Sequence, residues 1–161
     1  MPLCCSSVGL WAGGEPVLGA VYNFFHDELF TGVAGRGAWR NGEPIRVSGV
    51  RALARASLAT GFPHHHDYGD ESLRSFIGQV QGSKKIRMLG SAALMGAYVA
   101  CGWLDAYVED DVWLWDIAGA AAIVRAAGGI VRVRPGKAGV WACEIVCAAS
   151  AELSDILEKK E

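Results

Sequence analysis

The chain has 161 residues, of which 52% are hydrophobic and 20% are charged, a composition typical of one globular domain and not of a disordered chain. Its formal net charge of −2 provides no basic surface for nucleic acid or for an anionic membrane. No apolar run is long enough to cross a bilayer, and the first residues lack the basic and apolar regions of a secretory signal. These features predict a cytoplasmic protein that binds neither nucleic acid nor membranes.

The cysteines are odd in number, lack Cys-x-x-Cys spacing and lie in apolar stretches. This pattern favours reduced, buried thiols over disulfides, and it offers no convincing zinc site. The five residues are Cys4, Cys5, Cys101, Cys143 and Cys147.

The first 48 residues predict an antiparallel meander without a helix of its own. It consists of residues 3–12 and 15–23 around Gly13-Gly14, then 29–34, 38–40 and the Asn41-Gly42 turn. A sheet of this kind needs a cover for one face, and nothing before it in the chain supplies one.

Strands and helices alternate from residue 56 onward, after a short helical turn at 50–55. The predicted strands are 56–62, 85–89, 103–108, 130–134 and 143–148, and the predicted helices are 71–80, 90–101, 116–127 and 151–159. This order predicts βα crossovers and a mixed sheet, so the fold class is α/β. Ligands of such sheets gather beyond the strand ends.

Two further segments between these elements have a clear pattern. Leu73, Phe76, Ile77 and Val80 share one face of the 71–80 helix, which is therefore amphipathic. The polar stretch 63–69 contains three adjacent histidines, His64 to His66, and predicts an exposed loop in preference to a metal site.

The chain is organised around the segment from Asp111 to Gly129. Asp116 is placed to cap a helix start, and apolar residues recur at helical spacing from Ile117 to Ala127. Gly128 then supplies the left-handed residue that ends a helix. From these residues alone, a buried helix without chemistry and a functional helix start are both open.

An acidic group lies between a predicted strand end and this helix start. It comprises Glu109, Asp110, Asp111 and Asp116, and carboxylate oxygens in such a place suit Mg²⁺. The alternative is a solvated acidic loop, which we favour for Asp110 and Asp111.

A second candidate site is Leu89-Gly-Ser-Ala-Ala93, where a predicted strand ends and a helix begins. Backbone N–H groups at a helix start can bind an anion or a sugar hydroxyl. A simple helix cap at Ser91 accounts equally well for these residues.

Several motifs together carry a family resemblance. Trp115-Asp-Ile-Ala-Gly119, leading to Ala127-Gly-Gly129, resembles the C-terminal signature of the inositol monophosphatase family, which are Mg²⁺-dependent, lithium-sensitive phosphomonoesterases. Five more segments follow the family's order: Gly14-Glu-Pro-Val-Leu-Gly-Ala-Val-Tyr22, Asp27-Glu-Leu-Phe-Thr31, Gly35-Arg-Gly-Ala-Trp39, Asn41-Gly-Glu-Pro-Ile45 and Leu89-Gly-Ser-Ala-Ala93.

The resemblance implies an α+β sandwich that is N-terminally truncated. Residues 1–48 would be a remnant of its N-terminal sheet, and 49–161 its C-terminal α/β portion.

The resemblance also implies site residues. It assigns Asp116 as a ligand of the second Mg²⁺ and Glu109 as the residue that holds a hydroxyl of an inositol ring. The other implied substrate contacts are the backbone of Gly90, Ser91 and Ala92 and the side chain of Arg87.

The family's remaining metal ligands lie upstream, in a Gly-Glu-Glu segment and in Asp-Pro-Ile-Asp-Gly-Thr. No acid before Gly90 has such a context, and the threonine that helps to activate the attacking water is missing as well. The implied mechanism is in-line attack by a metal-activated water, which one ligand cannot assemble. We therefore assign no catalytic residue, and we expect weak Mg²⁺ binding and no activity from this chain alone.

The substrate and the assembly stay open at this level. The resemblance implies a small phosphate ester as substrate, namely inositol phosphate or a related sugar or polyol phosphate. Other possible substrates are histidinol phosphate, fructose bisphosphate and a nucleotide phosphate. The expected assembly is a homo-oligomer such as a dimer. The alternative is a non-catalytic, truncated chain that associates with another subunit through its exposed N-terminal sheet.

Overall fold

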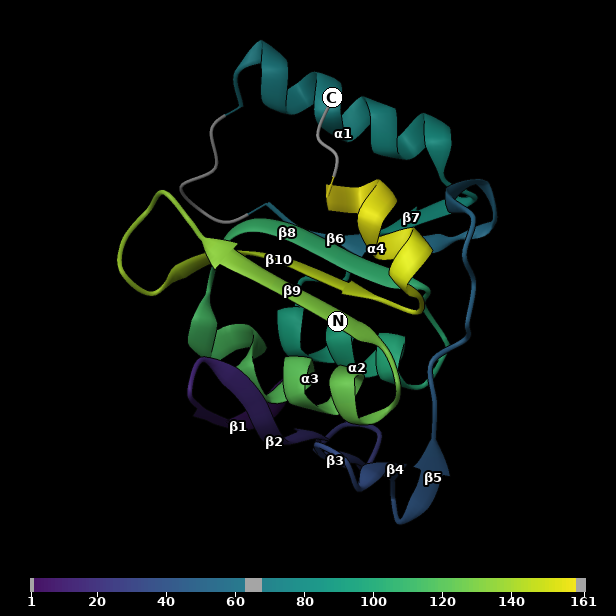
Figure 1. The fold of residues 1–161 in the computed structure, drawn as a ribbon, viewed down its shortest axis with the longest axis vertical. Coiled ribbons are helices and arrows are strands. Elements are labelled where there is room, and N and C mark those ends of the chain that lie inside the picture. Colours follow the sequence, from purple (N-terminus) through teal and green to yellow (C-terminus); the bar gives the residue numbers. More distant parts are fainter. Residues whose placement is uncertain (1, 63–67, 159–161) are drawn as a thin grey trace.

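The computed structural model describes residues 2–62 and 68–158. Figure 1 shows four layers: a first sheet, a pair of helices, a second sheet, and two helices on its far side. The predicted histidine loop includes residues 63–67 and to that extent lies outside the described residues. In the described part of the chain, no helix has the length and apolar character that a membrane crossing requires.

The first sheet is the predicted meander. Its strands pair antiparallel in chain order, and Gly13 and Gly14, both with positive φ, form the first hairpin turn. The strands are β1 (Cys5–Ala12), β2 (Glu15–Asn23), β3 (Glu28–Val33), β4 (Gly37–Arg40) and β5 (Glu43–Ile45).

The second sheet is mixed, as the alternating pattern predicts. Its order is β7-β6-β8-β10-β9, with parallel pairing from β7 to β8 and antiparallel pairing from β8 to β9. A short 3-10 turn, η1 (Leu53–Arg55), precedes it. The strands are β6 (Ser57–Thr60), β7 (Lys85–Arg87), β8 (Ala106–Trp113), β9 (Ile130–Pro135) and β10 (Ala142–Ala148).

Helices occupy two of the four layers. The inner pair is α2 (Ala92–Ala100) and α3 (Leu114–Ala126), and the outer pair is α1 (Asp70–Gly82) and α4 (Ala151–Glu158). The inner pair forms the main hydrophobic core between the two sheets, and α4 closes a second core on the far side of the second sheet.

Helix α3 supplies the cover that the first sheet needs. It contacts β1, β2 and β3, and its small residues allow a very close approach. A Cβ atom added at Gly19 would lie 1.9 Å from the carbonyl oxygen of Gly119, and one at Gly9 would lie 2.6 Å from the backbone of Ala118. The glycines at these contacts, Gly9, Gly19 and Gly119, therefore allow the helix and sheet backbones to pack directly against each other.

The opposite face of the first sheet is apolar and exposed. The register places Leu10 opposite Leu18 and Tyr22 opposite Leu29, and Val8 on the same face is 63% exposed. This face forms one outer surface of the molecule in Figure 1.

Two predictions around α3 are wrong. Strand β8 continues through the acidic residues to Trp113, because it stays paired with β10 as far as Ala142. Helix α3 consequently begins at Leu114, and Asp116 lies in its first turn without serving as the cap. The predicted ending is confirmed, since Gly128 has a φ of +86°.

Within the described part of the chain, the apolar face of α1 stays largely exposed. The helix forms where its periodicity predicts, but Leu73, Ile77 and Val80 are all exposed, and Phe76 is only half-buried. The thiols are all free, as predicted, but only Cys143 and Cys147 are buried, whereas Cys5 and Cys101 are half-buried and Cys4 is exposed.

Candidate active site

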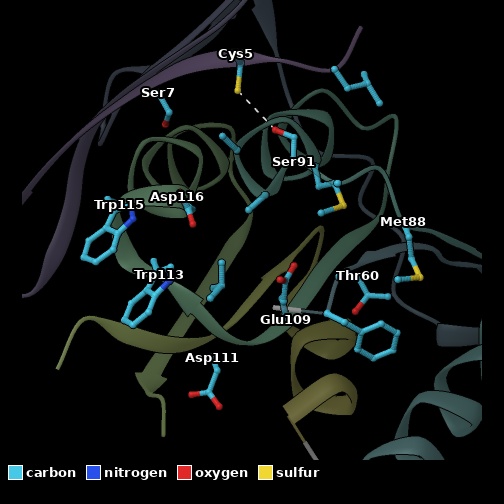
Figure 2. A pocket seen from close by; sticks show the side chains of 18 of the residues that line it. Cys5, Ser7, Thr60, Met88, Ser91, Glu109, Asp111, Trp113, Trp115 and Asp116 are labelled. Carbon is cyan, nitrogen blue, oxygen red and sulfur yellow. Dashed lines mark hydrogen bonds between the residues drawn. The ribbon is translucent and has the colours of Figure 1, made fainter. Parts of the chain in front are cut away.

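A cavity of about 1020 Å³ opens where the second sheet, the starts of α2 and α3, and the first strand meet (Figure 2). It lies beyond the carboxyl ends of β6 and β7, where ligands of parallel strands are expected. Its walls include Cys5 and Ser7 from β1, Thr60 and Gly61 after β6, Glu109 and Asp111 from β8, Ser91 and Ala92 at the start of α2, and Trp113, Trp115 and Asp116 around the start of α3.

Most of the predicted site residues line this one cavity, although they come from distant parts of the chain. They are Gly90, Ser91, Ala92, Glu109 and Asp116. Arg87 is not among the described residues that line it, and its guanidinium donates a hydrogen bond to the Ile86 carbonyl at 3.0 Å.

Glu109 is held in a fixed position inside the wall. It is 9% exposed, and its Oε2 accepts a hydrogen bond of 2.8 Å from the Tyr107 hydroxyl. Its carboxylate fills the space that a side chain at Gly61 would need, since a Cβ there would lie 2.4 Å from Oε2. Burial raises the pKa of Glu109, as do the negative charges of Asp116 and Asp110, against the lowering effect of the Tyr107 hydrogen bond.

We expect Glu109→Gln to stabilise the fold at neutral pH, because it removes a buried carboxylate and keeps an oxygen that can accept from Tyr107. The raised pKa means that the folded state binds the proton of Glu109 more tightly than the unfolded state does. Stability from this group is therefore fully present at low pH and is lost as pH rises through the raised pKa. The unfolding midpoint of the variant should exceed that of the wild type by an amount that grows from pH 4 to pH 7. A constant or reversed difference would contradict this.

Asp116 lies across the cavity from Glu109, and Figure 2 shows the two carboxylates pointing toward the same space. Its position in the first turn of α3 places its charge in the favourable field of a helix N-terminus. Desolvation nevertheless raises the pKa of Asp116. A carboxylate that is partly stripped of water and aimed into a cavity can hold a cation or a hydrogen-bond donor.

Ser91 is the N-cap of α2, which is the plain capping role predicted as one of its two alternatives. Its Oγ accepts from the Leu94 N–H at 3.4 Å and lies 3.6 Å from the Cys5 Sγ. The helix start is thereby tied to the first strand at the edge of the cavity.

Asp111 is not a solvated acid. A register shift between β8 and β10 places it at a bulge with a φ of +57°, and its Oδ1 accepts hydrogen bonds from the Ala138 N–H at 3.1 Å and from the Lys137 N–H. It therefore holds the loop that follows β9. The sequence carried no signal for this, because a bulge depends on the partner strand.

The residues described here do not make a complete Mg²⁺ site. Within residues 2–62 and 68–158, no group of three or more His, Cys, Asp or Glu side chains converges to hold a metal ion. Asp116 has the right chemistry for a Mg²⁺ ligand, but Mg²⁺ binding needs further oxygen ligands around it. The donor set that the family resemblance implies is thus not present in full.

Two aromatic wall residues were missed at the sequence level. The rings of Trp113 and Trp115 are stacked, with centroids 5.1 Å apart and planes 10° apart. The only signal was their nearness in the sequence, since Trp113 ends β8 and Trp115 lies in the first turn of α3.

Known proteins resemble this chain along nearly its whole length. The family model for the inositol monophosphatase family matches residues 1–160. Inositol monophosphatase 3 of Solanum lycopersicum is 39% identical over 161 residues, covering 98% of this chain and 60% of the tomato protein. Inositol-1-monophosphatase of Mesorhizobium japonicum is 39% identical over 135 residues, covering 81% of this chain and 50% of that protein.

Solved structures agree with the sequence matches. The suhB protein of Bartonella henselae superposes with a TM-score of 0.85 at 34% identity, covering 99% of this chain and 61% of that one. SuhB of Mycobacterium tuberculosis gives a TM-score of 0.86 at 31% identity, covering 99% and 64%. The chain spans about six tenths of the length of the tomato relative that it matches. It belongs to the inositol monophosphatase family.

Proposed function

We propose that this chain is the C-terminal part of a Mg²⁺-dependent phosphomonoesterase that acts on inositol phosphate or a related polyol phosphate. The observation that carries the proposal is the meeting of Asp116, Glu109 and the Gly90-Ser91-Ala92 backbone in one cavity. These are the residues to which the family resemblance assigns a metal ligand, a hydroxyl contact and a substrate-lining segment.

The roles follow from the environment of each group. Glu109 is buried and tied to Tyr107, so it offers a preoriented acceptor to a ring hydroxyl. Asp116 would be one Mg²⁺ ligand, and the start of α2 would place backbone N–H groups near the ester. We assign no role to Arg87, because its guanidinium is bonded to the Ile86 carbonyl outside the cavity wall.

The 161 residues alone should not turn over a phosphate ester. In metal-assisted phosphate hydrolysis, bound metal would activate the attacking water and stabilise the developing charge, and the described residues contribute no converging group of three metal ligands. A single aspartate among waters holds Mg²⁺ only weakly.

The test is a phosphate-release assay on the purified chain with inositol 1-phosphate and with a generic aryl phosphate, each with and without Mg²⁺. We expect rates at the buffer background, and the same rates for Asp116→Ala. Mg²⁺-dependent turnover that disappears in Asp116→Ala would disprove the inactivity of the chain while supporting Asp116 as a ligand.

The exposed apolar face of the first sheet supports a second candidate function. Val8, Leu10 and Leu18 present a flat apolar surface of the kind that marks a protein contact. On this hypothesis the chain is non-catalytic and only associates with another subunit. This hypothesis predicts that the chain assembles with another polypeptide but that the complex hydrolyses no phosphate ester. The first candidate function predicts Mg²⁺-dependent hydrolysis by the assembled complex.

A further inference from the structure

The start of α3, which carries Asp116, has no side-chain cap of its own. Trp113 is the N-cap residue, and its indole can donate a hydrogen bond but cannot accept one from a helix N–H. The N–H group of Leu114, the first in the helix, instead donates to the carbonyl of Trp141 at 2.9 Å. A helix start without a cap needs such acceptors from elsewhere. The position of this helix start therefore depends on a loop that is distant in the sequence.

That loop comprises residues 136–141 between β9 and β10, and we call it the β9–β10 loop. It is a compact turn, because the Gly136 N–H donates to the Ala142 carbonyl at 2.8 Å and the Ala142 N–H donates to the Gly139 carbonyl at 3.0 Å. A Cβ atom added at Gly139 would lie 3.9 Å from the Trp113 ring. The loop thus contacts both the N-cap residue and the first helical residue of α3.

Asp111 holds the β9–β10 loop in place. Its Oδ1 accepts hydrogen bonds from the N–H groups of Lys137 and Ala138, the second at 3.1 Å. Successive backbone N–H groups that point to one oxygen are suited to binding an anion such as a carboxylate. Gly136 packs against the same atom, since a Cβ there would lie 2.5 Å from it. A carboxylate makes stronger hydrogen bonds than a neutral acceptor does, so this contact is well suited to fix the loop.

The backbone of Asp111 also contributes to the arrangement. At the bulge, Asp110 and Asp111 of β8 lie opposite one residue of β10, Glu144. Asp111 has a φ of +57°, a left-handed conformation that aspartate tolerates better than most residues. The bulge lies between Glu109 and the start of α3, and Figure 2 shows the Asp111 carboxylate pointing away from the space that Glu109 and Asp116 share. This placement favours a role in orienting the site over a contact with the substrate.

We propose that Asp111 is a positioning residue for Asp116. By holding the β9–β10 loop against the start of α3, it fixes the direction in which Asp116 presents its carboxylate to a metal ion. This inference rests on the phosphatase function proposed above, and it adds a residue for which the family resemblance implied no role. The two carboxylates thus differ in function, since one holds a loop and the other faces the cavity.

Amide hydrogen exchange of the isotope-labelled chain, followed by NMR, tests this role without any assay of activity. Asp111→Gly keeps the left-handed backbone but removes the acceptor, so exchange of the Leu114 N–H should accelerate by about tenfold or more, the effect of losing a hydrogen bond to a charged group. Exchange of the Ala121 N–H, further along α3, should stay unchanged. Asp111→Asn keeps Oδ1 and should retain most of the protection of Leu114. Equal acceleration at Leu114 and Ala121 would show general destabilisation and contradict the proposal.

Asp27→Gly is the matched control, because Asp27 is also an aspartate with a positive φ, +52°, and is not among the described residues that line the cavity. It should leave exchange at Leu114 unchanged. The wild type gives a check that needs no variant to fold, since its Lys137 and Ala138 amides should exchange much more slowly than those of an unstructured peptide. The proposal is overturned if these two amides are unprotected, if Asp111→Gly leaves Leu114 unaffected, or if Asp111→Asn is as damaging as Asp111→Gly.

Metal dependence separates this inference from the phosphatase function. In a complex with a polypeptide that supplies the other metal ligands, Asp111→Gly should raise the Mg²⁺ concentration that gives half the maximal rate by about tenfold or more, as loss of a residue that supports a metal ligand does. Asp111→Asn should restore the wild-type requirement. A complex without turnover would contradict the phosphatase and leave the exchange result standing. Turnover with the same Mg²⁺ requirement in Asp111→Gly as in the wild type would contradict the positioning role alone.

Discussion

Gly19→Ala should be among the most damaging single-methyl changes in this chain. The added Cβ would lie 1.9 Å from the Gly119 carbonyl oxygen and 2.8 Å from its carbonyl carbon. Both are backbone atoms of α3, so the clash can be relieved only by moving the helix away from the sheet. Overpacking of this kind costs about 3 kcal/mol or more, a large share of the stability of a typical domain.

Thermal or urea unfolding measures this effect. A loss of about 3 kcal/mol corresponds to a fall in the melting temperature of about 10 °C for a chain of this size. Gly78→Ala is the matched control, because Gly78 lies inside α1 and an added Cβ there meets nothing within 4 Å. It should stabilise the chain by up to about 1 kcal/mol through helix propensity. A Gly19→Ala variant as stable as the wild type would contradict the close packing of α3.

The same packing connects stability to the site. The close contact between Gly19 and Gly119 lies one turn after Asp116 along α3, and the start of this helix forms part of the cavity wall. A helix displaced from the first sheet would carry Asp116 with it. The small residues of α3 therefore position the carboxylate on which the proposed function depends.

The sequence predicted most of the elements, because their signals are local. Turn residues such as Gly13-Gly14 and Asn41-Gly42 and the alternating pattern after residue 56 located both sheets. The start of α3 was wrong because β8 runs on to Trp113 through its pairing with β10, which is a contact between distant segments. The left-handed Asp111 was missed for the same reason.

The site could be predicted only in part. The patterns located Ser91 at a helix start, but they placed Glu109 at a strand end, whereas it lies within β8. The roles of both residues came from the family resemblance and stay proposals. The stacked tryptophans were missed because their contact depends on where β8 ends and α3 begins, and that boundary was predicted wrongly. The exposed face of α1 was missed because an amphipathic pattern normally predicts burial, whereas Leu73 and Ile77 contact solvent here.

The central claim is that these residues form the Asp116 side of a Mg²⁺ phosphatase site whose other ligands come from elsewhere. Its direct test is reconstitution: the chain is co-expressed with the part of tomato inositol monophosphatase 3 that lies outside the matched region, as a separate polypeptide. The family resemblance implies that this polypeptide carries the other metal ligands, so on the proposed function the complex should release phosphate from a phosphate ester only when Mg²⁺ is present.

Asp116→Ala in this complex should lower the rate by more than about a hundredfold, because loss of a residue that merely supports a metal ligand already costs up to about that much. Asp155→Ala is the control, since Asp155 lies in α4, away from the cavity, and pairs with Arg132 at the surface. It should retain the full rate. Mg²⁺-dependent phosphate release that requires Asp116 but not Asp155 is the result we predict. A folded, assembled complex without turnover, or one in which Asp116→Ala works as well as the wild type, would contradict it.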